Sequence, residues 1–217
     1  MPIHSFLKKI RKHQLNPGVI LDLGANIGNE SVILATQFPK AQIYSFECNP
    51  VAIEKCKEKT STCSNIQVIP KAVQSSYKKE IDFYSVVGSH PASSLFLTNG
   101  EYEKDQGKAR FVQQKIKVDS TRIDIWANEN GIDHIDLVWM DLQGAELDAL
   151  IGFGDLIKTV KMIYVEVQYK PIYKGSATNE AIDKFLLDNG FVNVWYDKKR
   201  LKLSKNWWTD KIYMAKR

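Results

Sequence analysis

The chain lacks features that identify whole classes of protein. No apolar run approaches the roughly 18 residues of a membrane-spanning helix, and the opening MPIHSFLKKIRKHQL has no apolar centre of a secretory signal. The three cysteines, Cys48, Cys56 and Cys63, form no CxxC or Cys/His cluster, so the sequence indicates neither a disulfide framework nor a zinc site. We therefore expect a cytoplasmic protein with free thiols, no membrane span and no bound metal.

Internal repeats, low-complexity tracts and linkers are also absent, and the charge imbalance is small. The net charge is +5 in 217 residues, with the basic residues spread along the chain and somewhat enriched at both ends. This balance fits solvated lysines as well as an anionic partner, because basic residues must cluster to bind one. With 44% hydrophobic residues, the chain suits one domain over residues 1–217.

Two nucleotide-binding motifs are missing from LDLGANIGNES, residues 21–31, which directly follows an apolar run. A dinucleotide fingerprint needs G-x-G-x-x-G, but from Gly24 the other two glycine positions are filled by Asn26 and Asn29. A P-loop ends in Gly-Lys-Ser/Thr, and no lysine follows Gly28. The stretch therefore lacks both pyrophosphate-binding patterns.

What the sequence does contain is an alternation of apolar runs and helix-like segments. Over residues 18–70 the pattern reads β-α-β-α-β, which predicts a parallel sheet covered on both faces. We also expect an N-terminal helix within 1–15 and a C-terminal antiparallel β-hairpin at the sheet edge within 191–217. The other expected elements are a helix from Ser120 to Gly131, a strand at 135–141, a short helix from Ala145, a strand at 162–167 and a helix at 178–190.

The middle of the chain departs from this alternation. EIDFYSVV and FVQQKIKV resemble strands, but the segment between them, 88–110, is polar and carries three glycines. Loops longer than about 12 to 15 residues are uncommon unless they bind something or are disordered. We predict that this segment is a mobile lid that contacts the substrate, with His90, Ser93 and Ser94 as candidate substrate-binding residues.

The residues around the first loop favour a ribose-containing ligand. They read D-x-G-x-N-x-G, and Glu47 lies 23 positions after Gly24, near the spacing of about 20 at which an acidic residue binds a ribose diol. S-adenosylmethionine fits, because its sulfonium and ammonium favour carboxylates and Gly24 and Gly28 permit close backbone approach. Asp22 either contacts this ligand or braces the turn, and Glu47 either holds the ribose or ends its strand at the surface.

Five blocks resemble the FkbM family of S-adenosylmethionine-dependent methyltransferases. They are DLGANIG, FECNP, IDLVWMDLQGAELDALIGF, YVEV and FLLDNGF, between Val19 and Tyr196, and G-A-E-L-x-A-L-I-G is the most specific. The resemblance implies a Rossmann-like class I methyltransferase: an α/β fold with a seven-stranded, mostly parallel sheet, helices on both faces and an antiparallel last strand. It also implies methylation of a hydroxyl oxygen on a sugar, a glycan or another small metabolite.

The resemblance also assigns site residues. It implies a cofactor site containing Asp22, Gly24, Ala25, Asn26, Gly28 and Glu47, to which we add Cys48, Ala72 and Asp141 as candidates. Asp141 and Glu166 are expected at strand ends facing the acceptor. The family commonly reads K-x-D-x-E-G, whereas this chain has Trp139 for the lysine and Gln143 for the glutamate. The departure leaves open whether a second carboxylate acts beside Asp141.

Methyl transfer from a sulfonium requires alignment of the acceptor and benefits from a base. Asp141 is the candidate base, although it could instead orient the methionine part of the cofactor or cap the helix from Ala145. His90 could share or replace that role, or stand aside. Glu166, the third catalytic candidate, either binds acceptor hydroxyls or only ends its strand.

Two other functions remain open. A nucleic-acid methyltransferase could use the stretch KKRLKLSKNWW, in which Trp207 and Trp208 either stack on bases or sugars or fold back onto the sheet edge. Neither an N-P-P-Y motif nor a full K-D-K-E set is found, so nucleic acid is not the expected partner. Trp139 and Gln143 also keep open a cofactor-binding protein without turnover.

Overall fold

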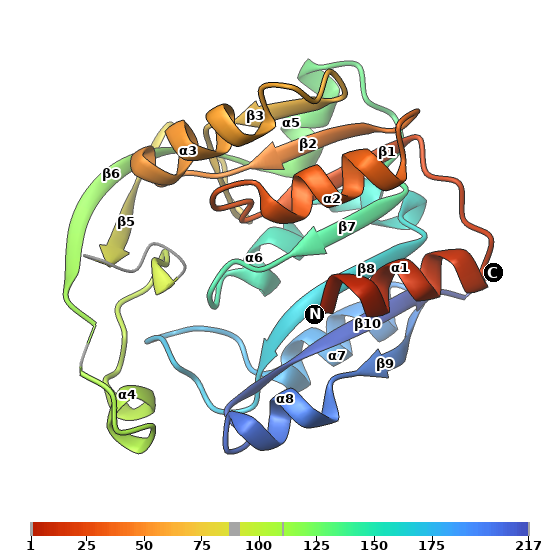
Figure 1. Cartoon of the computed structure of the whole chain (residues 1–217). Helices are drawn as coiled ribbons and strands as arrows, with labels where there is room; N and C mark the ends of the chain where they lie inside the picture. The colour runs from red at the N-terminus through yellow and green to blue at the C-terminus, as the bar shows by residue number, and fades with distance from the viewer. Residues whose placement is uncertain (1, 87–91, 110, 217) are drawn as a thin grey trace.

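A seven-stranded sheet forms the centre of the computed structural model, which describes residues 2–86, 92–109 and 111–216 (Figure 1). The strand order is β3-β2-β1-β7-β8-β10-β9, and β10 runs antiparallel to both of its neighbours while the other pairs are parallel. The predicted seven-stranded sheet with an antiparallel last strand is confirmed. Its strands are β1 (Val19–Leu23), β2 (Gln42–Phe46), β3 (Ile66–Ile69), β7 (Leu137–Met140), β8 (Met162–Gln168), β9 (Phe191–Tyr196) and β10 (Trp208–Ala215).

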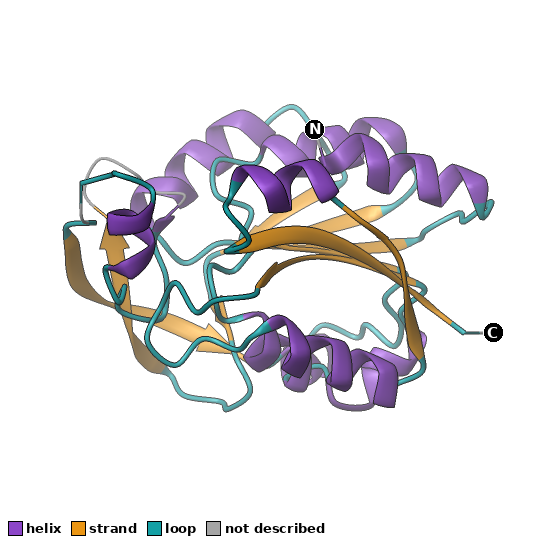
Figure 2. Ribbon diagram, turned by 90° about the horizontal axis from the view of Figure 1, so that it is seen from below, coloured by secondary structure: helices purple, strands orange, loops and turns teal. Residues whose placement is uncertain are grey.

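Helices cover both faces of this sheet (Figure 2). On one face α1 and α2 pack against β1, β7 and β8, with α3 beside α2. The opposite face is covered by α5, α6, α7 and the 3-10 helix η2. The buried residues of α1 recur with a helical period, so they form one apolar stripe: Ile3, Phe6, Leu7 and Ile10. The bounds are α1 (Pro2–Lys12), α2 (Asn29–Gln37), α3 (Pro50–Thr60), α5 (Ile123–Glu129), α6 (Glu146–Ile151), η2 (Gly154–Thr159) and α7 (Asn179–Asp188).

A second, three-stranded sheet was not expected from the sequence. It has the order β4-β6-β5 and comprises β4 (Ala72–Val73), β5 (Glu80–Val86) and β6 (Gln113–Thr121). In Figure 1, β5 and β6 lie apart from the main sheet, with the short helix α4 (Glu101–Asp105) beyond them. We call the described residues from 80 to 121 the arm.

The helix predicted from Ser120 begins three residues later, at Ile123, so that boundary was wrong. Ser120 and Thr121 are the last residues of β6 and pair with β4. The Ser120 hydroxyl donates to the carbonyl of Lys78 and accepts from Gln74 Nε2, and the N-cap position of the helix is taken by Arg122. Pairing between distant strands outweighs the local capping signal here.

Most of the segment predicted to be a lid lies in the arm. Residues 88–91 and Arg110 are outside the described residues, whereas 92–109 include α4 and a bridge between Ser94 and Tyr84 of β5. A second bridge joins Thr98 to Tyr173, in the loop that follows β8. Whether the segment moves as a lid stays a prediction.

The C-terminal pair of strands is interrupted by a short helix, α8 (Lys198–Leu203). The predicted antiparallel pairing of β9 and β10 is confirmed, but β10 lies inside the sheet and β9 alone of this pair at its edge. Trp207 is buried against Tyr102 of α4, with ring centroids 5.5 Å apart, and its Nε1 donates to Asp105. The stacking interpretation is therefore wrong for Trp207. Its ring is folded back onto the protein, although it packs on α4 of the arm.

Among residues 2–86, 92–109 and 111–216, no helix has both the length and the apolar character that crossing a membrane requires.

Candidate active site

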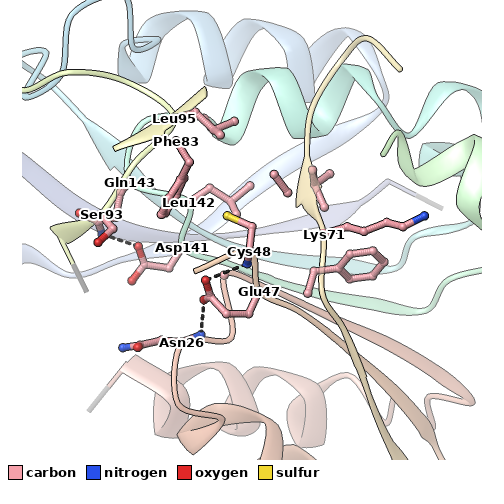
Figure 3. Close-up of a pocket in the computed structure, with 15 residues that line it drawn as sticks. Asn26, Glu47, Cys48, Lys71, Phe83, Ser93, Leu95, Asp141, Leu142 and Gln143 are labelled. Carbon is pink, nitrogen blue, oxygen red and sulfur yellow. Dashed lines mark hydrogen bonds between the residues drawn. The ribbon is translucent and has the colours of Figure 1, made fainter. Parts of the chain in front are cut away.

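A cleft lies where the carboxyl ends of β1, β2 and β7 face the arm, as Figure 3 shows. It contains about 640 Å³ of space, part of it open to solvent, and open parallel sheets bind ligands at this position. Among the described residues, the cleft is lined by Gly24, Asn26, Phe46, Glu47, Cys48, Lys71, Ala72, Val73, Phe83, Ser93, Leu95, Asp141, Leu142, Gln143 and Ala145. The structure therefore brings together Gly24, Asn26, Glu47, Cys48, Ala72, Ser93 and Asp141 of the predicted site.

Two glycines of the first loop have different structural roles. Gly24 has φ +85°, and a Cβ on it would lie 2.0 Å from the backbone oxygen of Asp141, so a side chain cannot fit between the ends of β1 and β7. A Cβ on Gly28 would lie 3.0 Å from Cys56 and from Thr60 of α3. Gly24 thus lets the floor of the cleft close, whereas Gly28 lets α2 pack on α3.

Glu47 is held by backbone N–H groups on both sides. Its Oε2 accepts from Asn26 N at 2.8 Å, and its Oε1 accepts from Cys48 N at 2.8 Å and from Asn49 N at 2.7 Å. Burial raises the pKa of Glu47, and the three N–H groups oppose that rise. A carboxylate has about four acceptor positions, so Oε2 retains one for a ligand hydroxyl.

Asn26, which lines the cleft, carries an unpaired acceptor. Its backbone takes a left-handed conformation, φ +49°, which asparagine adopts more readily than most residues. The side-chain Oδ1 is buried and has no hydrogen-bond partner among the described residues. Because an unsatisfied buried acceptor is destabilising by about 1–3 kcal/mol, this atom suits a ligand donor such as an ammonium.

The rest of the cleft wall is mostly apolar. Phe46 comes from β2, Ala72 and Val73 from β4, and Phe83 and Leu95 from the arm. Leu142 and Ala145 extend this surface from the loop after β7. An apolar pocket next to Glu47 suits a flat heterocycle attached to a ribose.

Several predicted cofactor residues support the loop instead of lining the cleft. Asp22 is 1% exposed and accepts a hydrogen bond from Ser31, to which Ser45 donates. Burial raises the pKa of Asp22 to about 7, partly opposed by the Ser31 hydrogen bond. Ala25 is buried as well. This arrangement matches the interpretation of Asp22 as a brace for the turn.

Asp141 and Glu166 are joined by the side chain of Gln143. The Nε2 of Gln143 donates to Asp141 Oδ1 at 2.6 Å and lies 3.5 Å from Glu166 Oε1. Burial raises the pKa of Asp141 to about 6, and the Gln143 hydrogen bond opposes this rise. Burial, followed by the charge of Asp141, raises the pKa of Glu166 well above its usual range. Of the two, Asp141 is the carboxyl that ionises first.

A third carboxyl, Asp210, was missed in the sequence. It pairs with Glu166 across β10 and β8 and is fully buried. It accepts from Tyr164 Oη at 2.6 Å and from Arg200 Nη1 at 2.7 Å. Its signal was weak, because a polar residue in a strand 44 positions beyond Glu166 reveals its neighbours only when the strand order is known.

Trp139, which departs from the family block, is a core residue. Its ring stacks on Tyr164, with centroids 3.5 Å apart and planes within 3°, and Phe6 of α1 meets it edge-on at 5.6 Å. A tryptophan here fills the space under α1. Trp139 is not among the described residues that line the cleft.

Glu146, also unassigned from the sequence, shapes the loop after β7. Its carboxylate accepts from the backbone N–H groups of Leu142 and Gly144. Burial raises its pKa to about 7, although these N–H groups oppose the rise. It belongs to the G-A-E-L block, which was the available signal.

The predicted acceptor residues are divided. His90 lies outside the described residues. Ser93 lines the cleft and accepts a hydrogen bond from Val86 N at 2.9 Å. Ser94 is buried and donates to the backbone oxygen of Gln143 at 2.7 Å, which ties the arm to the loop after β7.

Comparison with known proteins identifies the family. The model of the Methyltransferase FkbM domain matches residues 22–192, most of the chain. The chain belongs to the FkbM methyltransferase family. It is 30% identical over 168 residues to the 2-O-methyltransferase NoeI of Sinorhizobium fredii, which covers 76% of this chain and 69% of NoeI. It is also 26% identical over 205 residues to the AMB antimetabolite synthetase AmbE of Pseudomonas aeruginosa, covering 80% of this chain and 9% of AmbE.

Solved structures share the fold of this FkbM methyltransferase. An rRNA methylase from Streptococcus thermophilus aligns with a TM-score of 0.57 at 10% identity, covering all of this chain and 98% of that one. Fibrillarin from Aeropyrum pernix, solved with natively bound S-adenosyl-L-methionine, aligns with a TM-score of 0.50 at 12% identity, covering 91% and 66%. The chain is an S-adenosylmethionine-dependent methyltransferase with the predicted Rossmann-like fold, and the resemblance to the FkbM family is confirmed.

Proposed function

We propose that this FkbM methyltransferase transfers a methyl group from S-adenosylmethionine to a hydroxyl oxygen of a sugar, a glycan or another small metabolite. The observation that carries the proposal is the position of Asp141, a partly exposed carboxyl with an elevated pKa at the end of β7. The similarity to NoeI, a 2-O-methyltransferase, supports an oxygen acceptor.

The cleft residues fit the cofactor in three parts. The apolar wall formed by Ala72, Phe83 and Leu95 would take the adenine, and Glu47 would accept from a ribose hydroxyl. The unpaired Oδ1 of Asn26 would accept from the ammonium. When bound, S-adenosylmethionine would supply a methyl group on a positively charged sulfur. The acceptor oxygen would attack the methyl carbon in line with the sulfur, and neutral S-adenosylhomocysteine would leave.

The residues beyond β7 would then handle the acceptor. A hydroxyl is a weak nucleophile while it keeps its proton, and Asp141, with a pKa of about 6, is mostly ionised at neutral pH and so able to take that proton at Oδ2. Its Oδ1 is already engaged by Gln143. The amide of Gln143 and the hydroxyl of Ser93 also line the cleft. Such polar groups favour an acceptor with several hydroxyls.

The nucleic-acid alternative has less support. Its aromatic contribution depended on Trp207 and Trp208. Trp207 is buried against α4, and Trp208 is partly buried with Arg200 over its ring, whereas stacking on a base requires an accessible ring face. The alternative without turnover depended on Trp139 and Gln143, and both have structural roles that leave Asp141 at the cleft.

A transfer screen tests the proposal. The protein and its Asp141→Asn variant would be incubated with S-adenosylmethionine carrying a tritiated methyl group and with sugars, nucleotide sugars, glycans or RNA. We expect label on a hydroxyl-bearing small molecule or glycan with the parent and much less with the variant. Label that enters RNA only, or nitrogen only, would overturn the proposal.

A further inference from the structure

The side chain of Gln143 makes three polar contacts near the part of the cleft proposed for the acceptor. No role has been assigned to these contacts so far. Its Nε2 faces Asp141 and Glu166, while its Oε1 accepts from Tyr173 Oη at 2.9 Å. This orientation of the amide is fixed by chemistry: the flipped amide would point an oxygen at two carboxyls. Figure 3 shows Gln143 next to Asp141 at the cleft.

The backbone of Gln143 is held as firmly as its side chain. It has φ +53°, a left-handed conformation, and its carbonyl accepts from Ser94 of the arm. The next residue, Gly144, donates to Glu146. A non-glycine residue in this conformation persists only when its surroundings impose it. Here the arm does so through Ser94, and α6 does so through Glu146.

The charges around Gln143 are mainly negative. Asp141 and Glu166 flank its Nε2. Glu146 accepts from the next backbone N–H, that of Gly144, and Asp210 pairs with Glu166. Arg200, which binds Asp210, supplies positive charge, and Glu30 of α2 adds a distant negative one. Tyr164 and Tyr173 are further titratable groups beside Asp141 and Glu166, and Asp22 responds to the charge of Asp141.

A neutral donor at position 143 therefore gives the two flanking carboxyls different hydrogen bonds. Asp141 receives a short hydrogen bond from it, whereas Glu166 lies at the limit of hydrogen-bond distance. A hydrogen bond to the ionised form of a carboxyl favours that form, and a nearby like charge disfavours it. The glutamate common at this position in the family would add a negative charge and remove the donor.

We propose that Gln143 is a positioning residue that keeps Asp141 ionised and aimed at the acceptor hydroxyl while Glu166 behind it retains its proton. The inference rests on the proposed function, since it gives Asp141 the role of base. It concerns a departure from the family block, because the glutamate common at this position would carry a negative charge in place of the amide donor.

The test compares Gln143→Glu and Gln143→Leu with the parent. The first nearly preserves shape but adds charge and removes the donor, and the second removes both polar atoms without adding charge. Gln37→Glu, on the exposed last turn of α2, controls for the added charge. The ¹³C shift of the Asp141 carboxyl, assigned with Asp141→Asn, would be followed against pH without cofactor or acceptor.

In Gln143→Glu we expect the Asp141 titration to move upward by at least about one pH unit, as neighbouring like charges produce, and Gln37→Glu to leave it unchanged. The acidic limb of the methyl-transfer rate should move by the same amount, with the rate recovering at alkaline pH. Gln143→Leu should show a smaller upward movement. The dissociation constant for S-adenosylmethionine should change by less than about threefold in both.

An unchanged Asp141 titration in Gln143→Glu, or a rate lowered equally at every pH, would overturn the positioning role, since a purely structural residue gives the latter. Failure of the proposed function looks different. The titration would still move, but no hydroxyl acceptor would be methylated by the parent protein.

Discussion

Glu47 and Asp141 both lie at the carboxyl ends of strands that flank β1, yet they are held in opposite ways. Glu47 accepts hydrogen bonds from three backbone N–H groups. Asp141 is held by the side-chain amide of Gln143, two residues away. The Glu47 carboxylate is thus positioned by main-chain donors, whichever side chains those residues carry. Asp141, in contrast, depends on one side chain, so a substitution of Gln143 would change its hydrogen bonding and the charge next to it.

Asp141→Asn should break the comparison most strongly. It keeps the shape of the side chain but cannot take a proton, so we expect the rate constant for methyl transfer to fall by roughly a hundredfold or more. Cofactor affinity should change little, because we propose that Glu47 and Asn26 hold the cofactor. Single-turnover kinetics and calorimetry on the same variant measure both constants. A fall in affinity with the rate preserved would instead assign Asp141 to the methionine moiety.

Glu47→Ala should show the reverse pattern. Loss of a hydrogen bond to a charged group weakens binding by about 1.5–3 kcal/mol, and we expect the dissociation constant for S-adenosylmethionine to rise roughly tenfold or more. The rate at saturating cofactor should largely survive. Glu54→Ala, an exposed carboxylate on α3, is the matched control in calorimetry. Unchanged affinity in Glu47→Ala would remove this residue from the ribose site.

Ser94→Ala tests whether the arm reaches the acceptor side through Gln143. The variant loses a neutral hydrogen bond to the Gln143 carbonyl, worth about 0.5–1.5 kcal/mol. We expect KM for the acceptor to rise a few-fold, with cofactor affinity unaltered. Ser61→Ala, which removes an exposed hydroxyl at the end of α3, should leave both values at parent level. Equal effects of the two variants would separate the arm from the acceptor.

The smallest effect on catalysis is expected for Asp22→Asn, whose consequence is pH-dependent stability. Burial raises the pKa of Asp22 to about 7 from an ordinary value near 4. The native state therefore binds more protons than the unfolded state between about pH 4 and 7, and Asp22 lowers stability as pH rises through 7.

In Asp22→Asn that contribution is absent, so the melting temperature should fall less between pH 5 and 8. Scanning calorimetry of both proteins at matched ionic strength measures the two slopes. Glu146 has a raised pKa as well, so part of the slope should remain. Parallel slopes for the two proteins would contradict the assignment.

The difference between the surroundings of Glu47 and Asp141 also explains which parts of the site could be predicted from the sequence. The cofactor side was accessible because Gly24, Asn26 and Glu47 follow their strands directly, and their spacing is set by one β-α-β unit. The Rossmann-like fold and its seven strands followed from apolar periodicity and the family blocks. Local pattern and local structure coincide there.

The acceptor side depends on contacts between distant segments. Asp210 meets Glu166 only through the β8–β10 ladder, and Tyr173 reaches Gln143 across 30 residues. Ser120 had a capping signal that strand pairing overrode, and Trp207 had an exposed-looking lysine-rich context although it anchors the arm. Such contacts leave no periodic trace in a single sequence.

The position of β10 inside the sheet also sets the order in which the protein can assemble during synthesis. Chains emerge from the ribosome N-terminal end first, and β9 pairs with the sheet only through β10. Until residues 208–215 have been made, the edge of β8 is unpaired, and its seven residues are all buried in the finished molecule. An unpaired apolar edge is a template for aggregation. The exposed strand in the nascent chain is the one that carries Glu166, and the pairing of Glu166 with Asp210 forms only when β10 has been made.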